Sequence, residues 1–503
     1  MPPQGLLLIA AYMPEQWPVR FVDENMEPAS DEDLAWADVV MVSGMHIQAP
    51  QIHNIIRRAK AAGKVVALGG PSVSGAPEMY PDCDYLHVGE LGDGTNRLIA
   101  CLDESCAPPP QQVRFDTDDR LPMPDFPVPA YHLIRLDRYL LGSIQFSSGC
   151  PFRCEFCDIP ALYGRQPRLK TPKQLTAELD AMVAQGRYPT FIYFVDDNFV
   201  GNKKATREML PHLVAWQRKH GHPLRFGCEA TLNLAKQPEI LELMREAEFH
   251  TVFVGIETPE VDALKQMRKD QNATMPILEG INTLNSYGLE VTSGIILGLD
   301  TDSADTEARL KAFIDASNVP ILTINLLQAL PKTPLWDRLK RDNRLHREDA
   351  GLESNVVFLR PYDEVVATWR RAVAHAYAPE RLFERFLHQV EATYANRLVG
   401  PVRGKLTWNN LSLALVLAFN IVWRIGLFSD YRQWFWKAVL PAIRRGQIDA
   451  AFSMGVVGHH MITFSREAVR GEQNASFYSA QTRHSMSMEK PPQPAFERVG
   501  KSG

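Results

Sequence analysis

Residues 149–157 read Gly-Cys-Pro-Phe-Arg-Cys-Glu-Phe-Cys, a C-x3-C-x2-C pattern that follows the apolar run 139–146. We expect this segment to be a loop. Thiolates are soft ligands that suit iron–sulfur clusters, and ordinary electron-transfer clusters have four cysteine ligands. Cys150, Cys154 and Cys157 could hold three irons of a [4Fe–4S] cube and leave the fourth iron without a protein ligand. The spacing therefore predicts a cluster with an open coordination site, where chemistry can occur.

Two other interpretations of the three cysteines fit less well. A structural zinc site needs four ligands, so a distant His or Cys would have to complete it. Three closely spaced thiols cannot all form disulfides with one another. The other four cysteines have no metal-site spacing, and we interpret them as packing residues or surface thiols; they are Cys83, Cys101, Cys106 and Cys228.

The cysteine segment resembles the signature of radical S-adenosylmethionine (SAM) enzymes. The resemblance implies that SAM chelates the open iron through its amino and carboxylate groups. It also implies that one electron from the cluster splits the sulfonium and releases a 5′-deoxyadenosyl radical. Phe156, just before the third cysteine, matches the position whose aromatic ring lies near the adenine.

Length and composition are typical of a large enzyme. The chain has 503 residues, which predicts about three domains. It is 45% hydrophobic and 22% charged, enough apolar content for a sizeable core. Seven cysteines without a recognisable signal peptide predict reduced thiols and a cytoplasmic setting. A net charge of −5 gives no reason to expect nucleic acid as a partner.

Short apolar runs alternate with helical patterns over residues 1–110, which predicts βαβ units and a parallel, flavodoxin-like (Rossmann-like) sheet. We expect strands at 19–22, 38–43, 64–68 and 85–88, and a helix at 49–62. Ligands of such sheets lie beyond the carboxyl ends of the strands. Tight turns without a ligand are the alternative for the residues found there, which are Gly44, Met45, Gly69, Gly70, Pro71, Ser72, Gly89 and Glu90.

Next to the cysteine motif, this N-terminal region resembles the cobalamin-binding domain of the B12-dependent radical SAM class. The resemblance implies that the residues after the strands contact cobalamin. The D-x-H-x-x-G motif is absent, and neither His46 nor His53 lies in such a context, so no axial imidazole is expected. Relatives usually carry a strand before the segment that matches Pro2 to Leu6. We therefore expect the first strand of this sheet to be missing, or the start of the sequence to be misassigned.

Residues 111–138 are rich in proline and predict a linker. From 139 to 345 the alternation of strands and helices returns, as expected of the partial TIM barrel of the radical SAM core. Strands are predicted at 191–195, 225–229, 251–258, 291–300 and 321–328. Thr171 is expected to cap a helix that begins with Pro172.

Polar residues at the carboxyl ends of barrel strands are typical of functional sites. The resemblance implies that several of them contact SAM, and capping of a helix is the alternative for the two aspartates. Asn325 and Gln328 either face the cavity or are satisfied by backbone. The residues expected to contact SAM, besides Phe156, are Asp196, Asp197, Glu229, Glu257, Ile295 and Gly298.

Residues 346–484 predict a helical C-terminal domain, with helices at 361–376 and 379–396, and residues 485–503 predict a disordered tail. The run 411–428 is nearly continuous in apolar residues but contains Asn420 and Arg424. Aromatic and cationic residues follow it, a pattern typical of a membrane interface. A buried helical pair, attachment to a membrane surface and a true span remain as alternatives.

Several runs closely resemble the hopanoid C-2 methylase branch, and the likeness covers nearly the whole chain. They include Met45-His-Ile-Gln, Gly69-Gly-Pro-Ser-Val-Ser, Phe194-Val-Asp-Asp-Asn-Phe and Thr323-Ile-Asn-Leu-Leu-Gln-Ala-Leu-Pro-Lys-Thr-Pro. The resemblance implies methylation of a hopanoid lipid on ring A, at C-2, and a reducing partner such as flavodoxin or ferredoxin. Another substrate, such as a tetrapyrrole, is the alternative, and a non-catalytic cluster or cobalamin carrier is a third.

Overall fold

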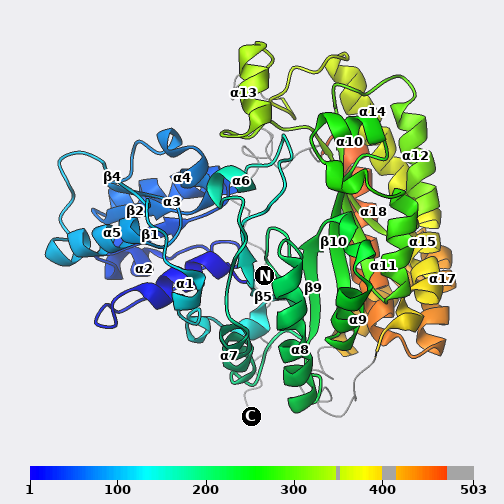
Figure 1. Cartoon of the computed structure of the whole chain (residues 1–503), viewed down its shortest axis with the longest axis horizontal. Coiled ribbons are helices and arrows are strands. Elements are labelled where there is room, and N and C mark those ends of the chain that lie inside the picture. The colour runs from blue at the N-terminus through cyan, green and yellow to red at the C-terminus, as the bar shows by residue number, and fades with distance from the viewer. Residues whose placement is uncertain (347–351, 399–414, 473–503) are drawn as a thin grey trace.

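The computed structural model of the chain describes residues 1–346, 352–398 and 415–472. An N-terminal parallel sheet lies on one side, an open barrel lies in the middle, and C-terminal helices cover the far side of the barrel (Figure 1). The predicted α/β class is confirmed. The tail 485–503 and the first residues of the run 411–428 lie outside the described residues.

The N-terminal sheet has four parallel strands in the order β1-β2-β3-β4. Apolar side chains on both faces pack against helices, as expected of a parallel sheet. The strands are β1 (Val39–Ser43), β2 (Val65–Gly69), β3 (Tyr85–Val88) and β4 (Val113–Asp116), and the main helices are α2 (Asp31–Trp36), α3 (Ala49–Ala61), α4 (Pro71–Gly75) and α5 (Asp93–Glu104).

Two expectations for this region are wrong. Residues 19–22 are not a strand, because the sheet offers them no hydrogen-bonding partner. β4 pairs with β3 in parallel, so the sheet extends past residue 110 into the predicted linker. The described chain starts with helix α1 (Gln4–Tyr12), whose Leu7 is buried in the core of the barrel. The start of this chain therefore contributes to the contact between the two domains.

The rest of the predicted linker is an irregular segment along the barrel. Three short 3-10 turns interrupt it, at Met123–Asp125, Tyr131–Leu133 and Leu136–Arg138. The amide of Gln174 donates to the carbonyls of Met123, at 3.0 Å, and Phe126, at 3.1 Å. The segment is thus fixed to the barrel at several points.

The central sheet has six strands in the order β12-β11-β10-β9-β8-β5, and all neighbours pair in parallel. The strands are β5 (Gly142–Ile144), β8 (Phe191–Phe194), β9 (Arg225–Ala230), β10 (Phe249–Glu257), β11 (Glu290–Leu297) and β12 (Ile321–Leu326). The outer helices are α7 (Pro172–Val183), α8 (Lys203–Lys219), α9 (Pro238–Glu246), α10 (Val261–Gln266), α11 (Ile277–Ser286), α12 (Thr306–Ser317) and α13 (Pro334–Arg341).

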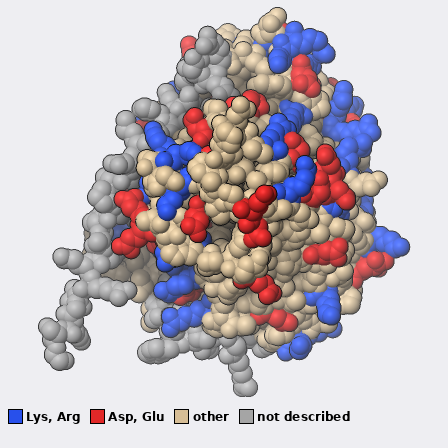
Figure 2. Space-filling view, turned by 90° about the vertical axis from the view of Figure 1, so that its left-hand side faces the viewer, with Lys and Arg blue, Asp and Glu red and all other residues tan. Residues whose placement is uncertain are grey.

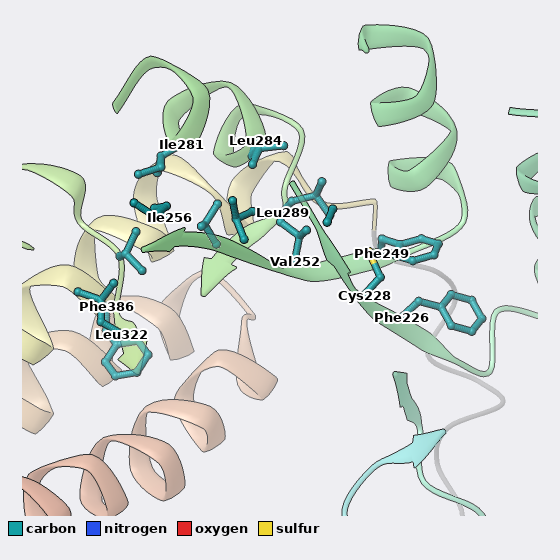
Figure 3. Packing of buried hydrophobic residues seen from close by; sticks show 14 of the residues in the cluster. Phe226, Cys228, Phe249, Val252, Ile256, Ile281, Leu284, Leu289, Leu322 and Phe386 are labelled. Carbon is teal, nitrogen blue, oxygen red and sulfur yellow. The ribbon is translucent and has the colours of Figure 1, made fainter. Parts of the chain in front are cut away.

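Alternate residues of each barrel strand point outward into the main core, where helices cover them. Figure 3 shows Ile281 and Leu284 of α11 pointing toward the sheet, and Phe386 beside Leu322 of β12. The predicted helix start at α7 is confirmed, because Thr171 and Gln174 form a capping box there.

The C-terminal region is helical in its described parts. It contains α14 (Tyr362–Ala376), α15 (Pro379–Ala392), α17 (Arg432–Arg444) and α18 (Ile448–Arg470). The predicted helix 379–396 ends earlier, at Ala392, and a 3-10 turn (Tyr394–Asn396) follows. Within the described ranges, no helix combines the length and the apolar character needed to cross a bilayer.

Candidate functional site

The carboxyl ends of the two sheets face each other. Glu90, which follows β3, accepts a hydrogen bond from the hydroxyl of Ser148 at 3.0 Å and forms an ion pair with Arg168 of the barrel domain. Lys332, which follows β12, donates to the carbonyl of Ser74 at 2.5 Å. Ligand sites of parallel sheets lie at these ends. The predicted cobalamin edge and the cysteine loop therefore lie next to each other.

The cysteine segment is a loop, as predicted, and lies between β6 (Ser147–Ser148) and α6 (Ile159–Leu162). Gly149 has φ +95°, a value that favours glycine, and it turns the chain into Cys150. Burial raises the pKa values of the Cys150 and Cys157 thiols, and the neighbouring cysteine thiols raise them further. The three thiols thus lie close enough to influence one another's charge.

These residues fit an iron–sulfur cluster. The amide of Gln271 donates to Sγ of Cys154 at 3.4 Å. Hydrogen bonds to the ligand sulfurs are a recognised feature of such clusters and tune their potential. Across residues 1–346, 352–398 and 415–472, no group of three or more His, Cys, Asp or Glu side chains is arranged to hold a single metal ion.

Asp196 and Asp197 hold the start of the cysteine loop. Asp196 accepts from the amides of Phe146 and Ser147 and from the Ser147 hydroxyl, and Asp197 accepts from the amide of Gly149 at 2.7 Å. Burial raises the pKa of Asp196 to about 7 and that of Asp197 to about 6. Neither caps the next helix, because the N-cap of α8 is Asn202. Contact of either carboxylate with SAM remains a prediction.

Glu229 lies on the inner side of β9. Its neighbours Cys228 and Ala230 are buried, whereas the Glu229 side chain is exposed toward the hollow of the barrel. Protein nevertheless surrounds the carboxylate, and this burial, with the charges of Asp197, Asp196 and Glu257, raises its pKa to about 7. An accessible carboxylate in this position can accept hydrogen bonds from an ammonium or from ribose hydroxyls.

Glu257 ends β10 at a bulge and has φ +66°. Its carboxylate forms an ion pair with Lys269, which is also buried. Ile295 pairs with Glu257 across the strands and is buried. Gly298 has φ +89°, and its amide donates to Asp302 at 2.7 Å. The SAM residues predicted at these strand ends are thus brought together at one end of the barrel.

The predicted cobalamin residues line the ends of β1, β2 and β3. Gly70 has φ +90°, and a Cβ there would lie 2.3 Å from Oγ of Ser43, so only glycine fits. Ser72 is buried and shares a hydrogen bond of 2.5 Å with the Tyr80 hydroxyl. Met45 is 57% exposed at the rim. Gly44 accepts from the amide of Ser72, Gly69 ends β2 before Pro71 begins α4, and the amide of Gly89 donates to Oγ of Ser74.

Two histidines lie near this edge. Nδ1 of His46 lies 3.5 Å from Oγ of Ser72, and the ring of His53 stacks on Tyr80 with centroids 5.0 Å apart. Glu90, in contrast, uses its carboxylate for the contact between the domains. Its predicted contact with cobalamin would therefore compete with Arg168.

The sequence matches the Radical SAM superfamily over residues 144–313 and a domain of unknown function (DUF4070) over residues 333–474. It is 57% identical to the hopanoid C-2 methylase of Rhodopseudomonas palustris (strain TIE-1) over 483 residues, which is 96% of this chain and 91% of that protein. The chain belongs to the hopanoid C-2 methylase family of radical SAM proteins.

Other relatives and solved structures are more distant. The bacteriochlorophyllide d C-12(1)-methyltransferase of Chlorobaculum tepidum is 26% identical over 67% of this chain and 74% of that protein. The fold resembles that of TsrM from Kitasatospora setae, solved with cobalamin and a [4Fe-4S] cluster bound, with a TM-score of 0.54 and 16% identity over 87% of this chain and 90% of that one. The fold also resembles that of OxsB, solved with aqua-cobalamin and SAM bound. The TM-score is 0.55, and the identity is 13% over 91% of this chain and 75% of that one.

Sequence reasoning missed two residues beside the radical SAM motif. Gln271 bonds to Cys154, and Nζ of Lys269 lies 5.6 Å from the centroid of the Phe156 ring. Burial lowers the pKa of Lys269, but Glu257 and the thiols of Cys154 and Cys157 raise it above its ordinary value. Both residues follow α10 in a polar stretch that has neither a helical nor a strand periodicity. Only the tertiary fold brings that stretch to the cysteine loop.

Proposed function

We propose that this protein is a cobalamin-dependent radical SAM methyltransferase that methylates an unactivated ring A carbon, C-2, of a hopanoid lipid. The main support is the meeting of the two strand-end edges, where Glu90 and Lys332 bridge the domains. Methyl transfer to a carbon needs the methyl donor and the radical source at one substrate. The 57% identity to a hopanoid C-2 methylase supports the choice of substrate.

In this proposal Cys150, Cys154 and Cys157 hold the [4Fe–4S] cluster, and the ends of β1, β2 and β3 hold cobalamin. When bound, the cluster and SAM would supply a carbon-centred radical, and cobalamin would supply the methyl group. Asp196 and Asp197 keep the cysteine loop in position through its backbone amides. Glu229 and Glu257 would orient the bound SAM from inside the barrel.

The target carbon explains why no general base is proposed. An unactivated C–H bond has no acidity that a carboxylate or a histidine could exploit. The residues of the site therefore bind, orient and exclude water, and the cofactors supply the reactivity. A small reducing protein such as flavodoxin or ferredoxin would supply the electrons.

The test is incubation of the anaerobically reconstituted protein with cobalamin, SAM, a reductant and a hopene. We expect release of 5′-deoxyadenosine and a hopanoid whose mass has increased by one methyl in place of one hydrogen. A parallel incubation with a tetrapyrrole in place of the hopene tests the alternative substrate, and methylation of the tetrapyrrole alone would favour it. Absence of SAM cleavage by the loaded protein would reject the enzyme and favour the carrier.

Two cysteine variants control this experiment. Cys154→Ala removes a proposed cluster ligand and should abolish release of 5′-deoxyadenosine. Cys106→Ala removes an exposed thiol and should leave both the iron content and the release unchanged. Circular dichroism on each variant checks the fold. Full activity of Cys154→Ala with normal iron content would contradict the assignment of the cluster.

A further inference from the structure

The helical residues that precede α17 present an apolar face to solvent. Leu415 is 62% exposed, Phe419 64%, Trp423 51% and Phe428 67%. Val422 and Leu427 extend the same surface. We call these six residues the apolar face. Soluble monomers rarely expose a large contiguous apolar patch. We therefore expect this surface to bind a partner or a membrane.

The opposite side of the same helix fixes its orientation. Ile421 and Ile425 are buried and belong to the main core. The indole of Trp436 in α17 donates to the carbonyl of Gly426 at 2.9 Å. Because this side is held by packing, the apolar face points outward in the folded protein. A simple buried helical pair, one of the predicted alternatives, does not account for it.

The aromatic residues of the apolar face form a cluster. The rings of Phe419 and Trp423 stack with centroids 6.0 Å apart, and those of Trp423 and Phe428 meet edge to face at 5.0 Å. Aromatic rings next to cations are typical of segments at the membrane interface. Arg424 and Arg432 are the exposed cations beside this cluster.

The local charge fits an anionic surface. Residues 415–470 contain seven Lys and Arg and three Asp and Glu. Four of these cations form ion pairs, which are Lys437 with Glu384, Arg445 with Glu391, Arg466 with Asp430 and Arg470 with Glu472. Arg424 and Arg432, by contrast, are exposed next to the apolar face in the sequence. Near a membrane, each basic residue adds to the attraction by anionic lipids. In contrast, the side of the molecule formed by the N-terminal domain shows both signs of charge interspersed (Figure 2).

The packed side of the helix defines its orientation at a bilayer. Residues 415–427 are helical, with a π-helical stretch at Ile421–Leu427, and no helix among the described residues is long and apolar enough to cross a membrane. A helix with one apolar and one packed side lies in the plane of the interface. It packs on α17 and α18, away from the N-terminal sheet (Figure 1).

We propose that the apolar face docks the enzyme on the surface of an anionic lipid bilayer. The proposal rests on the proposed function, because a hopanoid substrate is found in a membrane. Phe419, Trp423 and Phe428 insert below the headgroups, and Arg424 and Arg432 contact the lipid phosphates. Docking brings the enzyme to its substrate at the surface of the bilayer.

The test is flotation of the full-length protein with vesicles of phosphatidylcholine, with and without phosphatidylglycerol. The wild-type protein should float with the anionic vesicles and bind the neutral ones more weakly. The double variant Phe419→Glu/Trp423→Glu should bind at least about tenfold more weakly, since it adds two charges to the inserted cluster. Arg424→Gln/Arg432→Gln should lose mainly the preference for phosphatidylglycerol.

Val469→Glu is the matched control, because Val469 is 52% exposed on α18 outside the apolar face. Its binding to vesicles should equal that of the wild type. A wild-type protein that stays off the vesicles would overturn the proposal, as would a wild-type dimer that Trp423→Glu converts to a monomer in sedimentation. Flotation needs no turnover, so a failure of hopanoid methylation leaves this result unaffected.

Discussion

At the scale of single residues, the site is dominated by carboxylates that share one end of the barrel. Asp196, Asp197 and Glu229 all have raised pKa values, because burial penalises their charge and their neighbours repel it. Asp196 and Asp197 offset part of this cost through backbone hydrogen bonds. Glu229 instead faces the hollow of the barrel, where a bound cation would relieve the repulsion.

Glu229 should make stability depend on pH. Its pKa rises from 4.5 to about 7 on folding, so between these values the folded protein binds more protons than the unfolded one. The contribution of Glu229 to the free energy of unfolding is therefore fully present below about pH 4.5. This contribution is lost as the pH rises toward 7. Glu229→Gln removes this contribution, and its stability should fall less between about pH 4.5 and 7.5 than that of the wild type.

Denaturant unfolding of the cofactor-free protein at several pH values measures this difference. Glu208→Gln, which changes an exposed carboxylate on α8, should follow the wild-type profile. Parallel profiles of Glu229→Gln and the wild type would show that Glu229 titrates alike in the folded and unfolded chain.

At the scale of elements, an open barrel has two edge strands whose backbone groups need partners. The hydroxyl of Tyr131 donates to the carbonyl of Ser143 on β5 at 3.0 Å. On β12, the Tyr377 hydroxyl accepts from the amide of Leu322 at 3.0 Å and donates to its carbonyl, and Trp369 donates to Ile324. Side chains from outside the barrel thus complete both edges.

Removing the Tyr377 hydroxyl should destabilise the barrel. Tyr377→Phe keeps the ring but leaves a buried amide and a buried carbonyl of Leu322 without this partner, which costs about 1–3 kcal/mol. Denaturant unfolding measures the loss. Tyr12→Phe, whose hydroxyl bonds to an exposed asparagine, should cost less. Equal unfolding free energies for Tyr377→Phe and the wild type would show that the β12 edge needs no such partner.

At the scale of the whole molecule, the chemistry requires that two domains keep one relative position. Glu90 connects them, because it contacts Ser148 next to the cysteine loop and pairs with Arg168 and Arg120. α1 and the irregular segment before β5 add a second contact, through Leu7 and Tyr131 in the barrel core. The relative position of the two sheets thus depends on contacts between residues far apart in the chain.

Arg168→Met should loosen this contact. The half-buried Glu90 loses a charged hydrogen-bond partner, which costs about 1.5–3 kcal/mol. Hydrogen exchange should become faster at the amides of residues 146–150, which lie at the interface. Arg97→Met, which breaks an exposed ion pair on the outer side of α5, should leave those amides unchanged. Unchanged exchange in Arg168→Met would mean that other contacts hold the domains together.

Local patterns in the sequence were enough to predict the cysteine loop, the strands of both sheets other than β4 and β5, and the capped start of α7. Each depends on neighbours a few residues apart, such as the C-x3-C-x2-C spacing or the pair Thr171 and Gln174. The grouping of Asp196, Glu229 and Glu257 was also predictable, because parallel strands bring their carboxyl ends to one edge.

Contacts between distant segments decided the rest. Residues 19–22 have the composition of a strand but no partner, whereas Val113–Asp116 become β4 because β3 offers them a free edge. Lys269 and Gln271 reach the cysteine loop only after folding. A strand, a buried ion pair and an exposed apolar face are each defined by the segment that packs opposite, and local patterns of neighbouring residues do not reveal which distant segment that is.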